Sequence, residues 1–118
     1  MKKLTRNILV VGGIFLLAIA FYFSFKTGSP GQYDEFAQCL TAKGIKMYGT
    51  NWCTYCKKQK ELFGSSFKYI DFVDCDKNKQ ECLAAGIKGY PTWKINGENY
   101  LGLQQLSRLA ELSGCELR

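Results

Sequence analysis

The hydrophobic pattern divides the 118-residue chain into an apolar N-terminal run and a longer part in which apolar and polar positions alternate. Residues 7–25 carry no charge and consist largely of Ile, Leu, Val, Ala and Phe. At about 1.5 Å per residue, a helix of this length spans roughly 28 Å, close to the ~30 Å hydrocarbon core of a bilayer. We therefore expect residues 7–26 to form a single transmembrane helix.

The sequence around this run indicates on which side of the membrane the rest of the chain lies. Residues 1–6 contain three basic residues and no acidic one, so the positive-inside rule places them in the cytoplasm and the remainder outside. A cleaved signal peptide is the alternative, since Ala18 and Ala20 fit the small-x-small form of a cleavage site. The aromatic-rich residues 21–25 continue the apolar stretch and favour an uncleaved anchor. Under both interpretations the rest of the chain lies in the periplasm or an equivalent extracytoplasmic space.

Residues 33–118 have the periodicity of one small α/β domain, and residues 27–32, with Gly, Ser and Pro, are typical of a linker. Helical patterns lie at 34–43, 53–63, 78–86 and 103–112, and strand patterns lie at 45–48, 69–73, 92–95 and 99–101. Asn78 and Glu81 form a capping-box pattern for the third of these helices. The strand–helix–strand unit predicts a parallel pair, and the Asn96-Gly97 dipeptide predicts an antiparallel hairpin. The expected fold is a mixed sheet of about four strands flanked by helices.

Composition and charge narrow the classes of function. The chain contains six cysteines and no histidine, which excludes Ser-His-Asp and Cys-His catalysis and any metal site that includes histidine. The net charge is +6, but residues 1–26 hold four basic and no acidic groups, against twelve basic and ten acidic in residues 27–118. A nucleic-acid-binding domain needs a basic surface on its folded part, so we expect no nucleic-acid partner.

Two of the cysteines stand in the segment Trp52-Cys53-Thr54-Tyr55-Cys56, which follows a strand pattern and begins a helix. Backbone N–H groups and the helix dipole at such a position stabilise thiolate over thiol. We expect Cys53 to be the exposed attacking thiolate of thiol–disulfide exchange and Cys56 to be the more buried resolving thiol. A zinc site would need two further ligands at compatible spacing, so neither a metal nor a cofactor is expected. A purely structural disulfide between the two cysteines is the other alternative.

The order of these motifs resembles the thioredoxin superfamily, because the Cys53/Cys56 motif follows a strand and Tyr90-Pro91 precedes a hairpin and a final helix. The resemblance implies that Pro91 has a cis peptide bond and lies against the cysteine pair. It also implies that the Tyr90 backbone pairs with an extended segment of the substrate. We expect Trp52, Tyr90 and Pro91 to form the substrate-binding surface, with Trp52 shielding the cysteine pair.

A more specific resemblance is to the thioredoxin-like domains that are fused to, or work beside, vitamin K epoxide reductase homologues. It covers nearly all of residues 33–118 and is carried by Phe36-Ala37-x-Cys39-Leu40-Thr41, Lys46-Met47-Tyr48-Gly49, Trp52-Cys53-x-x-Cys56, Gln59-Lys60-x-Leu62-Phe63-Gly64, Gly89-Tyr90-Pro91-Thr92-Trp93 and Leu109-Ala110-x-x-Ser113-Gly114-Cys115. The resemblance implies that the domain collects electrons from folding exported proteins and passes them to the membrane reductase, which is an oxidising role. Because this chain has one expected membrane segment, a vitamin K epoxide reductase-like partner would be a separate protein.

Two departures from the family pattern bear on the direction of electron flow. Met47 occupies the position, six residues before Cys53, at which ordinary thioredoxins carry a buried acid, so their proton relay to Cys56 is missing. The intervening Thr54-Tyr55 pair lacks the histidine of strong oxidants, which argues for an intermediate reduction potential. The alternative functions are a reductant or disulfide isomerase of the same compartment and a non-catalytic thioredoxin-like binding module.

The remaining cysteines, Cys39, Cys75, Cys82 and Cys115, allow three pairings. A bridge between Cys75 and Cys82 is sterically easy because one ends a strand pattern and the other begins the next helix, and it leaves Cys39 to pair with Cys115. Loop-closure entropy gives roughly 2.5 kcal/mol for the short loop and roughly 4.5 kcal/mol for the long one. We expect both bridges to be structural, and a redox relay through Cys75 and Cys82 is the alternative.

Overall fold

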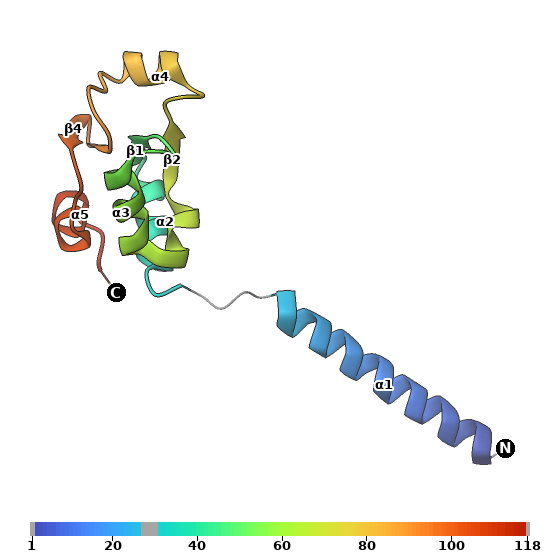
Figure 1. The fold of residues 1–118 in the computed structure, drawn as a ribbon. Helices are drawn as coiled ribbons and strands as arrows, with labels where there is room; N and C mark the ends of the chain where they lie inside the picture. The colour runs from blue at the N-terminus through green and yellow to red at the C-terminus, as the bar shows by residue number, and fades with distance from the viewer. Residues whose placement is uncertain (1, 27–30, 118) are drawn as a thin grey trace.

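The computed structural model describes residues 2–26 and 31–117, so residues 27–30 of the expected linker lie outside the described part. The first element, α1 (Lys2–Lys26), is one continuous helix (Figure 1). Its stretch Lys2–Tyr22 has a mean hydropathy of 2.0 and is long and apolar enough to cross a membrane. A membrane anchor and a signal sequence both meet this criterion of length and composition.

The described residues form a sheet of four strands in the order β2-β1-β3-β4. These strands are β1 (Lys46–Gly49), β2 (Asp71–Asp74), β3 (Thr92–Ile95) and β4 (Glu98–Leu101). β1 and β2 are parallel, whereas β1 and β3, and β3 and β4, are antiparallel. Asn96 and Gly97 in the last turn have φ values of 51° and 80°, as both central residues of a type I′ hairpin require. The predicted parallel pair and the predicted hairpin are thus confirmed.

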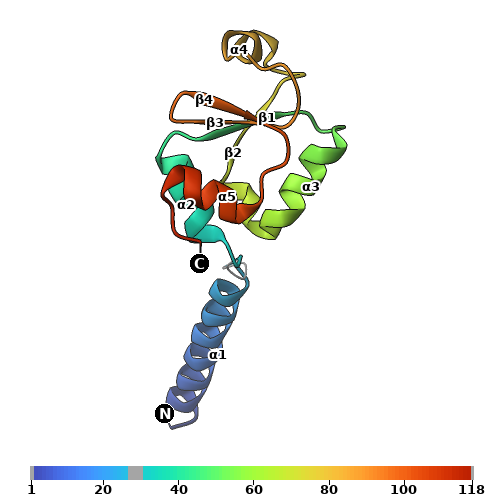
Figure 2. The same ribbon diagram turned by 90° about the vertical axis from the view of Figure 1, so that its left-hand side faces the viewer.

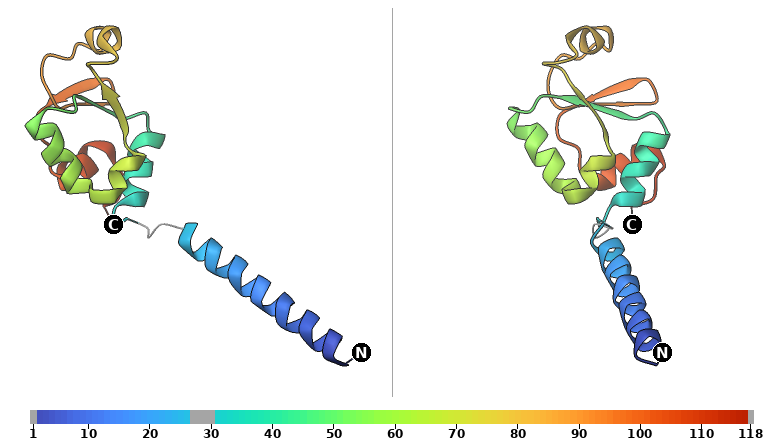
Figure 3. Two further views of the ribbon diagram at one scale, coloured as in Figure 1. Left: turned by 45° about the vertical axis from the view of Figure 1, so that its right-hand side comes forward. Right: turned by 90° about the vertical axis from the view of Figure 1, so that its right-hand side faces the viewer.

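Helices cover both faces of this sheet. α2 (Asp34–Ala42), α3 (Thr54–Phe63) and α5 (Leu106–Ser113) lie on one face, and α4 (Lys79–Ala84) lies on the other (Figure 2). Figure 3 shows the same separation of α4 from two other directions. The mixed four-stranded sheet with these helices is the thioredoxin-like fold that the sequence predicts.

The side chains on the two faces of the sheet form two separate apolar clusters. Successive residues of β1 point to opposite faces, so Met47 packs into the larger cluster and Tyr48 into the smaller one. The larger cluster contains residues from α2, α3, β3 and α5, among them Phe36, Leu40, Cys56, Phe63, Trp93 and Leu109. This cluster therefore fixes the helix that carries the cysteine pair against the sheet.

The segment between α3 and β2 differs from the prediction. Gly64 follows α3 with a φ of 58°, and a 3-10 helix, η1 (Gly64–Tyr69), then occupies residues up to the position where we expected a strand to begin. The ring of Phe67 in this helix packs edge-on against Phe63, with centroids 6.0 Å apart. Packing of Phe67 against the core favours the additional helical turn, so β2 begins later than expected.

The cap of α4 and the start of α5 also differ from the prediction. Asn78 does not cap α4 with its side chain, because its Nδ2 donates to the carbonyl of Asp74, 3.0 Å away. The capping-box prediction is therefore wrong. α5 begins at Leu106, three residues later than expected, because the backbone N–H of Gln104 donates to the Gln59 side chain at 2.8 Å.

Candidate redox site

Cys53 lies at the N-cap of α3, where the chain leaves the loop that follows β1. Its backbone is extended, with φ −70° and ψ 122°, and its Sγ accepts a hydrogen bond from the backbone N–H of Cys56 at 3.1 Å. The N–H groups of a first helical turn have no partners within the helix, and together with the dipole they stabilise negative charge. This placement agrees with the sequence pattern and suits a thiol that reacts as thiolate.

Cys56 lies one turn along α3 and is fully buried. Burial raises the pKa of its thiol to about 12, and the hydrogen bond with the Cys53 side chain acts in the same direction. A hydrogen bond from the Thr50 backbone and the charge of Lys60 lower that pKa. Cys56 is therefore a thiol at neutral pH, and its deprotonation is a step that the protein has to assist.

The exposure of Cys53 differs from the prediction. We expected an exposed attacking thiol, but Cys53 has a relative exposure of 7%. Its Sγ turns back over the start of α3 to accept the N–H of Cys56, which removes most of the side chain from solvent. Cys56, with an exposure of 0%, is the more buried of the two, as expected. Both cysteines are free thiols in the structure.

Gly49, at the end of β1, allows the strand to approach the cysteine pair closely. A Cβ atom at this position would lie 2.7 Å from the Sγ of Cys56 and 3.2 Å from the ring of Phe72. Cβ atoms essentially never approach another side chain as closely as the first of these distances, so a larger residue would displace the thiol. A glycine is thus required for the approach of β1 to α3.

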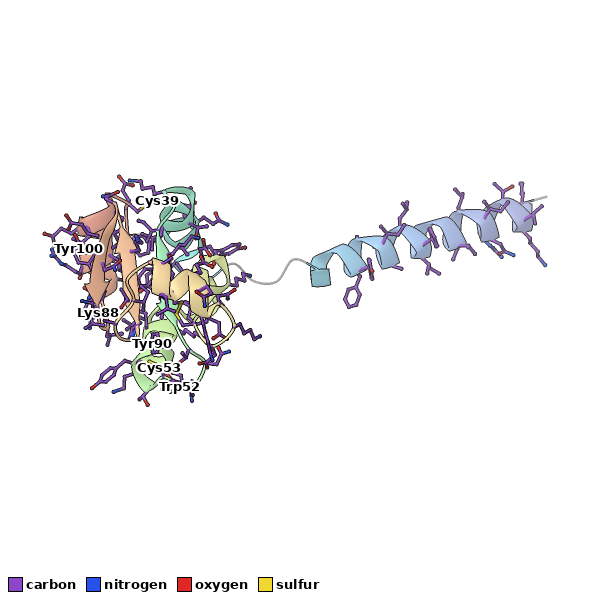
Figure 4. The ribbon with its side chains drawn as sticks, turned by 90° about the horizontal axis from the view of Figure 1, so that it is seen from above. Cys39, Trp52, Cys53, Lys88, Tyr90 and Tyr100 are labelled. Carbon is purple, nitrogen blue, oxygen red and sulfur yellow. A yellow bond between two sulfur atoms is a disulfide. The ribbon has the colours of Figure 1, made fainter. Side chains whose placement is uncertain are left out.

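Two aromatic side chains form an exposed surface beside the cysteine pair. Trp52 has a relative exposure of 66%, and its Nε1 donates to the carboxylate of Asp76 at 2.8 Å. Its ring meets the ring of Tyr90 edge-on with centroids 6.2 Å apart, and Figure 4 shows both residues beside Cys53. Pro91 is buried and follows a cis peptide bond. The structure therefore brings Trp52 and Tyr90 together next to Cys53, with Pro91 directly after Tyr90 in the chain.

The four other cysteines form two disulfides, Cys39–Cys115 and Cys75–Cys82. The first joins α2 to the residues after α5 across 76 positions of sequence, and the second joins the end of β2 to α4 across 7 positions. Figure 4 shows Cys39 at the opposite end of the domain from Cys53. These are the two pairs that the sequence favours, and they leave Cys53 and Cys56 as free thiols.

Sequence reasoning assigned no role to Gln59 or Lys60, which follow Cys56 on α3. Gln59 is fully buried, and its Oε1 accepts hydrogen bonds from Trp93 Nε1 at 3.0 Å and from the Gln104 N–H at 2.8 Å. Its Nε2 donates to the Gln104 carbonyl at 2.9 Å. The network therefore connects α3 with β3 and with the segment before α5. The spacing of three and four residues from Cys56 places both residues on its helical face, and this spacing is the signal that would have found them.

The position six residues before Cys53 is occupied by Met47, which is fully buried in the larger cluster. A thioether has no proton to exchange with Cys56. Within residues 2–26 and 31–117, no three Cys, Asp or Glu side chains converge in an arrangement that would hold a metal ion. The chemistry that this site can carry is that of its two thiols.

No protein-family model matches the chain. The chain is similar to the thiol-disulfide oxidoreductase LTO1 of Arabidopsis thaliana, with 39% identity over 90 residues. The matched region is 69% of this chain and 24% of LTO1, so the chain spans about a quarter of that relative's length.

Two solved structures are also similar to the chain, both with 23% sequence identity. The oxidised thioredoxin of Plasmodium falciparum matches with a TM-score of 0.44, covering 66% of this chain and 86% of the thioredoxin. A structure described as that of a malarial protein matches with a TM-score of 0.43, covering 58% of this chain and 89% of its own.

The fold and the site together define the class of protein. The sheet order, the flanking helices and a free Cys-x-x-Cys pair at the start of α3 are those of a thioredoxin-like domain. The chain is therefore a domain of thioredoxin-like fold preceded by an apolar helix, and its similarity to LTO1 covers about a quarter of that relative.

Proposed function

We propose that this chain is a membrane-anchored thiol–disulfide oxidoreductase that acts on cysteine-containing exported proteins through Cys53 and Cys56. The observation that carries the proposal is the position of the Cys53 Sγ at the N-cap of α3, 3.1 Å from the backbone nitrogen of Cys56, with both thiols free. The name of the relative LTO1, a thiol-disulfide oxidoreductase, supports the same chemistry.

In the oxidising direction, the disulfide between Cys53 and Cys56 is the oxidant. A substrate thiolate attacks the Sγ of Cys53, the bond between Cys53 and Cys56 breaks, and Cys56 leaves with the electron pair and takes up a proton. A second thiolate of the substrate then attacks the mixed disulfide. The substrate disulfide forms, Cys53 leaves as thiolate, and two electrons have passed from the substrate to the cysteine pair.

The substrate segment is proposed to lie against the aromatic surface beside Cys53. Trp52 and Tyr90 are both accessible there, with relative exposures of 66% and 37%, and their rings are in contact. The peptide groups next to Pro91 are proposed to pair with the substrate backbone as an added strand. Such pairing recognises an extended chain around a cysteine and is independent of most side chains, which suits unfolded exported proteins.

We further propose that the chain works as an oxidant and that a separate vitamin K epoxide reductase-like membrane protein reoxidises it. The support is the resemblance of its motifs to the domains that accompany such reductases, together with the membrane-spanning length of α1. The reduction potential of the Cys53/Cys56 pair tests the direction. A value of about −120 to −180 mV fits an oxidant or isomerase, whereas a value of about −270 mV assigns the alternative role of a reductant.

The proposed chemistry is tested by replacing each thiol of the pair in the full-length chain, purified in detergent micelles. We expect Cys53→Ser to abolish the acceleration of insulin reduction by dithiothreitol and the oxidation of a reduced, unfolded substrate, because no mixed disulfide can form at this position. Cys56→Ser should instead accumulate a mixed disulfide between Cys53 and the substrate, visible as a shift on a non-reducing gel.

The paired variant Cys75→Ser with Cys82→Ser is the control, since it replaces two cysteines that form a disulfide outside the proposed site. It should retain most of the exchange activity, because that bridge lies outside the proposed site. Loss of exchange in this variant with correct folding would favour the relay alternative. Full activity of the Cys53→Ser variant would contradict the proposed function and favour a non-catalytic binding module.

A further inference from the structure

The buried thiol of Cys56 poses an electrostatic problem for the exchange reaction. It has to carry negative charge when it attacks Cys53 and when it leaves from Cys53, yet burial opposes that charge. Met47 offers no charge at the position of the acid in ordinary thioredoxins. The charges that act on Cys56 include those of the Cys53 and Lys60 side chains, and of these two only Lys60 is positive.

Lys60 lies four residues after Cys56 on α3, so both side chains are on one face of the helix. Its burial differs from that of the neighbouring lysines, because Lys60 is half-buried while Lys57 and Lys58 are exposed. Its Nζ lies 4.2 Å from the centroid of the Phe72 ring, a distance at which the ring face attracts a cation. The ammonium is therefore held toward the protein, although an extended lysine on a helix surface is free to point into solvent.

The loop after β1 connects Lys60 to the thiol. Asn51 accepts a hydrogen bond from the Lys60 Nζ at 3.4 Å, and the preceding residue, Thr50, bonds to Cys56 through its backbone. The Phe72 ring also lies near the thiol. A Cβ atom placed on Gly49 would lie 2.7 Å from the Cys56 Sγ and 3.2 Å from the edge of the Phe72 ring. The ring under the ammonium and the loop that binds it thus both adjoin the buried sulfur.

We propose that Lys60 is a positioning residue of the exchange reaction, whose ammonium, held by Phe72 and Asn51, stabilises the thiolate form of Cys56. The proposal rests on the proposed function of the cysteine pair. In the resolving step, the Cys56 thiolate attacks Cys53, a new S–S bond forms, the bond from Cys53 to the substrate sulfur breaks, and the substrate leaves as thiolate. In the reverse direction the same ammonium stabilises Cys56 as the leaving group.

The elements around the ammonium contribute few other charges. From β2, Asp74 faces it through Asn51, whose Nδ2 donates to that carboxylate at 3.1 Å. Asp76, after β2, is bound to the indole of Trp52. η1 contributes the uncharged ring of Phe67, whose centroid lies 5.4 Å from the Lys60 Nζ. If replacing Lys60 changes the ionisation of Cys56, the loss of the ammonium itself is therefore the cause.

The test separates the two steps of exchange with a coloured disulfide. The full-length chain in detergent micelles, with the Cys53/Cys56 pair reduced, is mixed with 5,5′-dithiobis(2-nitrobenzoate). Attack by Cys53 releases one thionitrobenzoate and leaves a second on Cys53 as a mixed disulfide. Attack by Cys56 then releases the second, so the slow phase of colour measures the resolving step alone.

We expect Lys60→Gln to slow the second release about three- to tenfold at neutral pH and to leave the first nearly unchanged. The loss of a nearby positive charge raises the pKa of a thiol, so the pH profile of the second release should move upward by about half to one unit. Lys60→Arg should retain the wild-type profile within about twofold. The matched controls Lys57→Gln and Lys58→Gln, on the same helix but exposed, should behave as wild type.

The possible failures are distinguishable. The absence of a second release from the wild-type chain would overturn the proposed function itself. A normal wild-type profile with an unchanged second release in Lys60→Gln would overturn the role of Lys60 alone. Equal slowing of both releases in Lys60→Gln, or an equal effect of Lys57→Gln, would also overturn it, since either result indicates a general change of access or of surface charge.

Discussion

Gly49 controls how closely β1 approaches the buried thiol of Cys56. The strand ends here, and the loop that follows carries Thr50 and Asn51 to their contacts with Cys56 and Lys60. The absence of a side chain at this residue leaves the space that the thiol occupies. The redox site therefore depends on a residue that takes no part in its chemistry.

We predict that Gly49→Ala destabilises the reduced domain by about 1–3 kcal/mol, because its methyl group would lie 2.7 Å from the Cys56 Sγ in a packed core. Gly89→Ala is the matched control. Its methyl group would lie 2.9 Å from a methyl group of Leu101, but that side chain is exposed and can move, so the cost should be below about 1 kcal/mol. Urea unfolding of both variants measures the difference, and equal costs would contradict the account.

At the scale of secondary-structure elements, Gln59 determines how α3 sits relative to β3. Its side-chain amide satisfies the indole N–H of Trp93 and both backbone groups of Gln104, and Gln59 and Trp93 are fully buried. Since α3 carries the cysteine pair and β3 follows Pro91, this amide fixes the distance between the two halves of the site. It also explains why α5 begins three residues later than its apolar pattern indicates.

We predict that Gln59→Leu lowers the free energy of unfolding by about 2–5 kcal/mol, because it leaves a buried indole N–H and backbone groups of Gln104 without partners. Gln104→Ala is the control, since the network uses only the backbone of that residue, and it should cost less than about 1 kcal/mol. Denaturant unfolding followed by tryptophan fluorescence compares the two. If Gln59→Leu costs no more than Gln104→Ala, the amide does not hold the elements together.

The two disulfides also act at the scale of elements. Cys39–Cys115 joins α2 and the end of the chain after α5, and Cys75–Cys82 joins β2 and α4. The long loop contributes more to the stability of the folded domain than the short one, because closing it removes more conformational freedom from the unfolded chain. Both bridges stabilise a small domain whose apolar core is limited.

At the scale of the whole molecule, α1 stands apart from the domain in composition. Its stretch Lys2–Tyr22 is exposed along its length, and none of its described residues belongs to the two apolar clusters. An apolar helix of this length is unstable in water and stable in a bilayer, where its backbone groups are already paired. We propose that it holds the redox domain at the membrane surface.

We predict that the full-length chain stays with the membrane fraction after alkaline extraction. Replacing Val11 and Leu16 by Arg should release it, since a charge near the middle of a bilayer costs about 2.5–3.5 kcal/mol per residue. Leu117→Arg, which adds charge to the exposed end of the domain, should not. If the measured mass of the mature protein instead corresponds to a chain that starts at Phe21, this result would support a cleaved signal sequence.

How much of this protein can be read from the sequence depends on the range of the interactions involved. The types of the elements from residue 34 onward, the parallel pair and the Asn96-Gly97 hairpin follow from periodicity and turn residues, which act between neighbours in the chain. The start of α3 beside Cys53 follows from the same local signals. The 3-10 helix η1 was not predictable in this way, because it depends on the contact of Phe67 with Phe63.

The sequence by itself therefore determined the groups from which the molecule is built: a Cys-x-x-Cys pair at a helix start, four further cysteines available for two bridges, and an apolar helix before the domain. The tertiary structure decided how those groups behave. It set the low exposure of Cys53, the burial that keeps Cys56 protonated, and the position of Lys60 over Phe72. Burial and charge at a site arise from side chains that are distant in sequence, and only the folded chain brings these together.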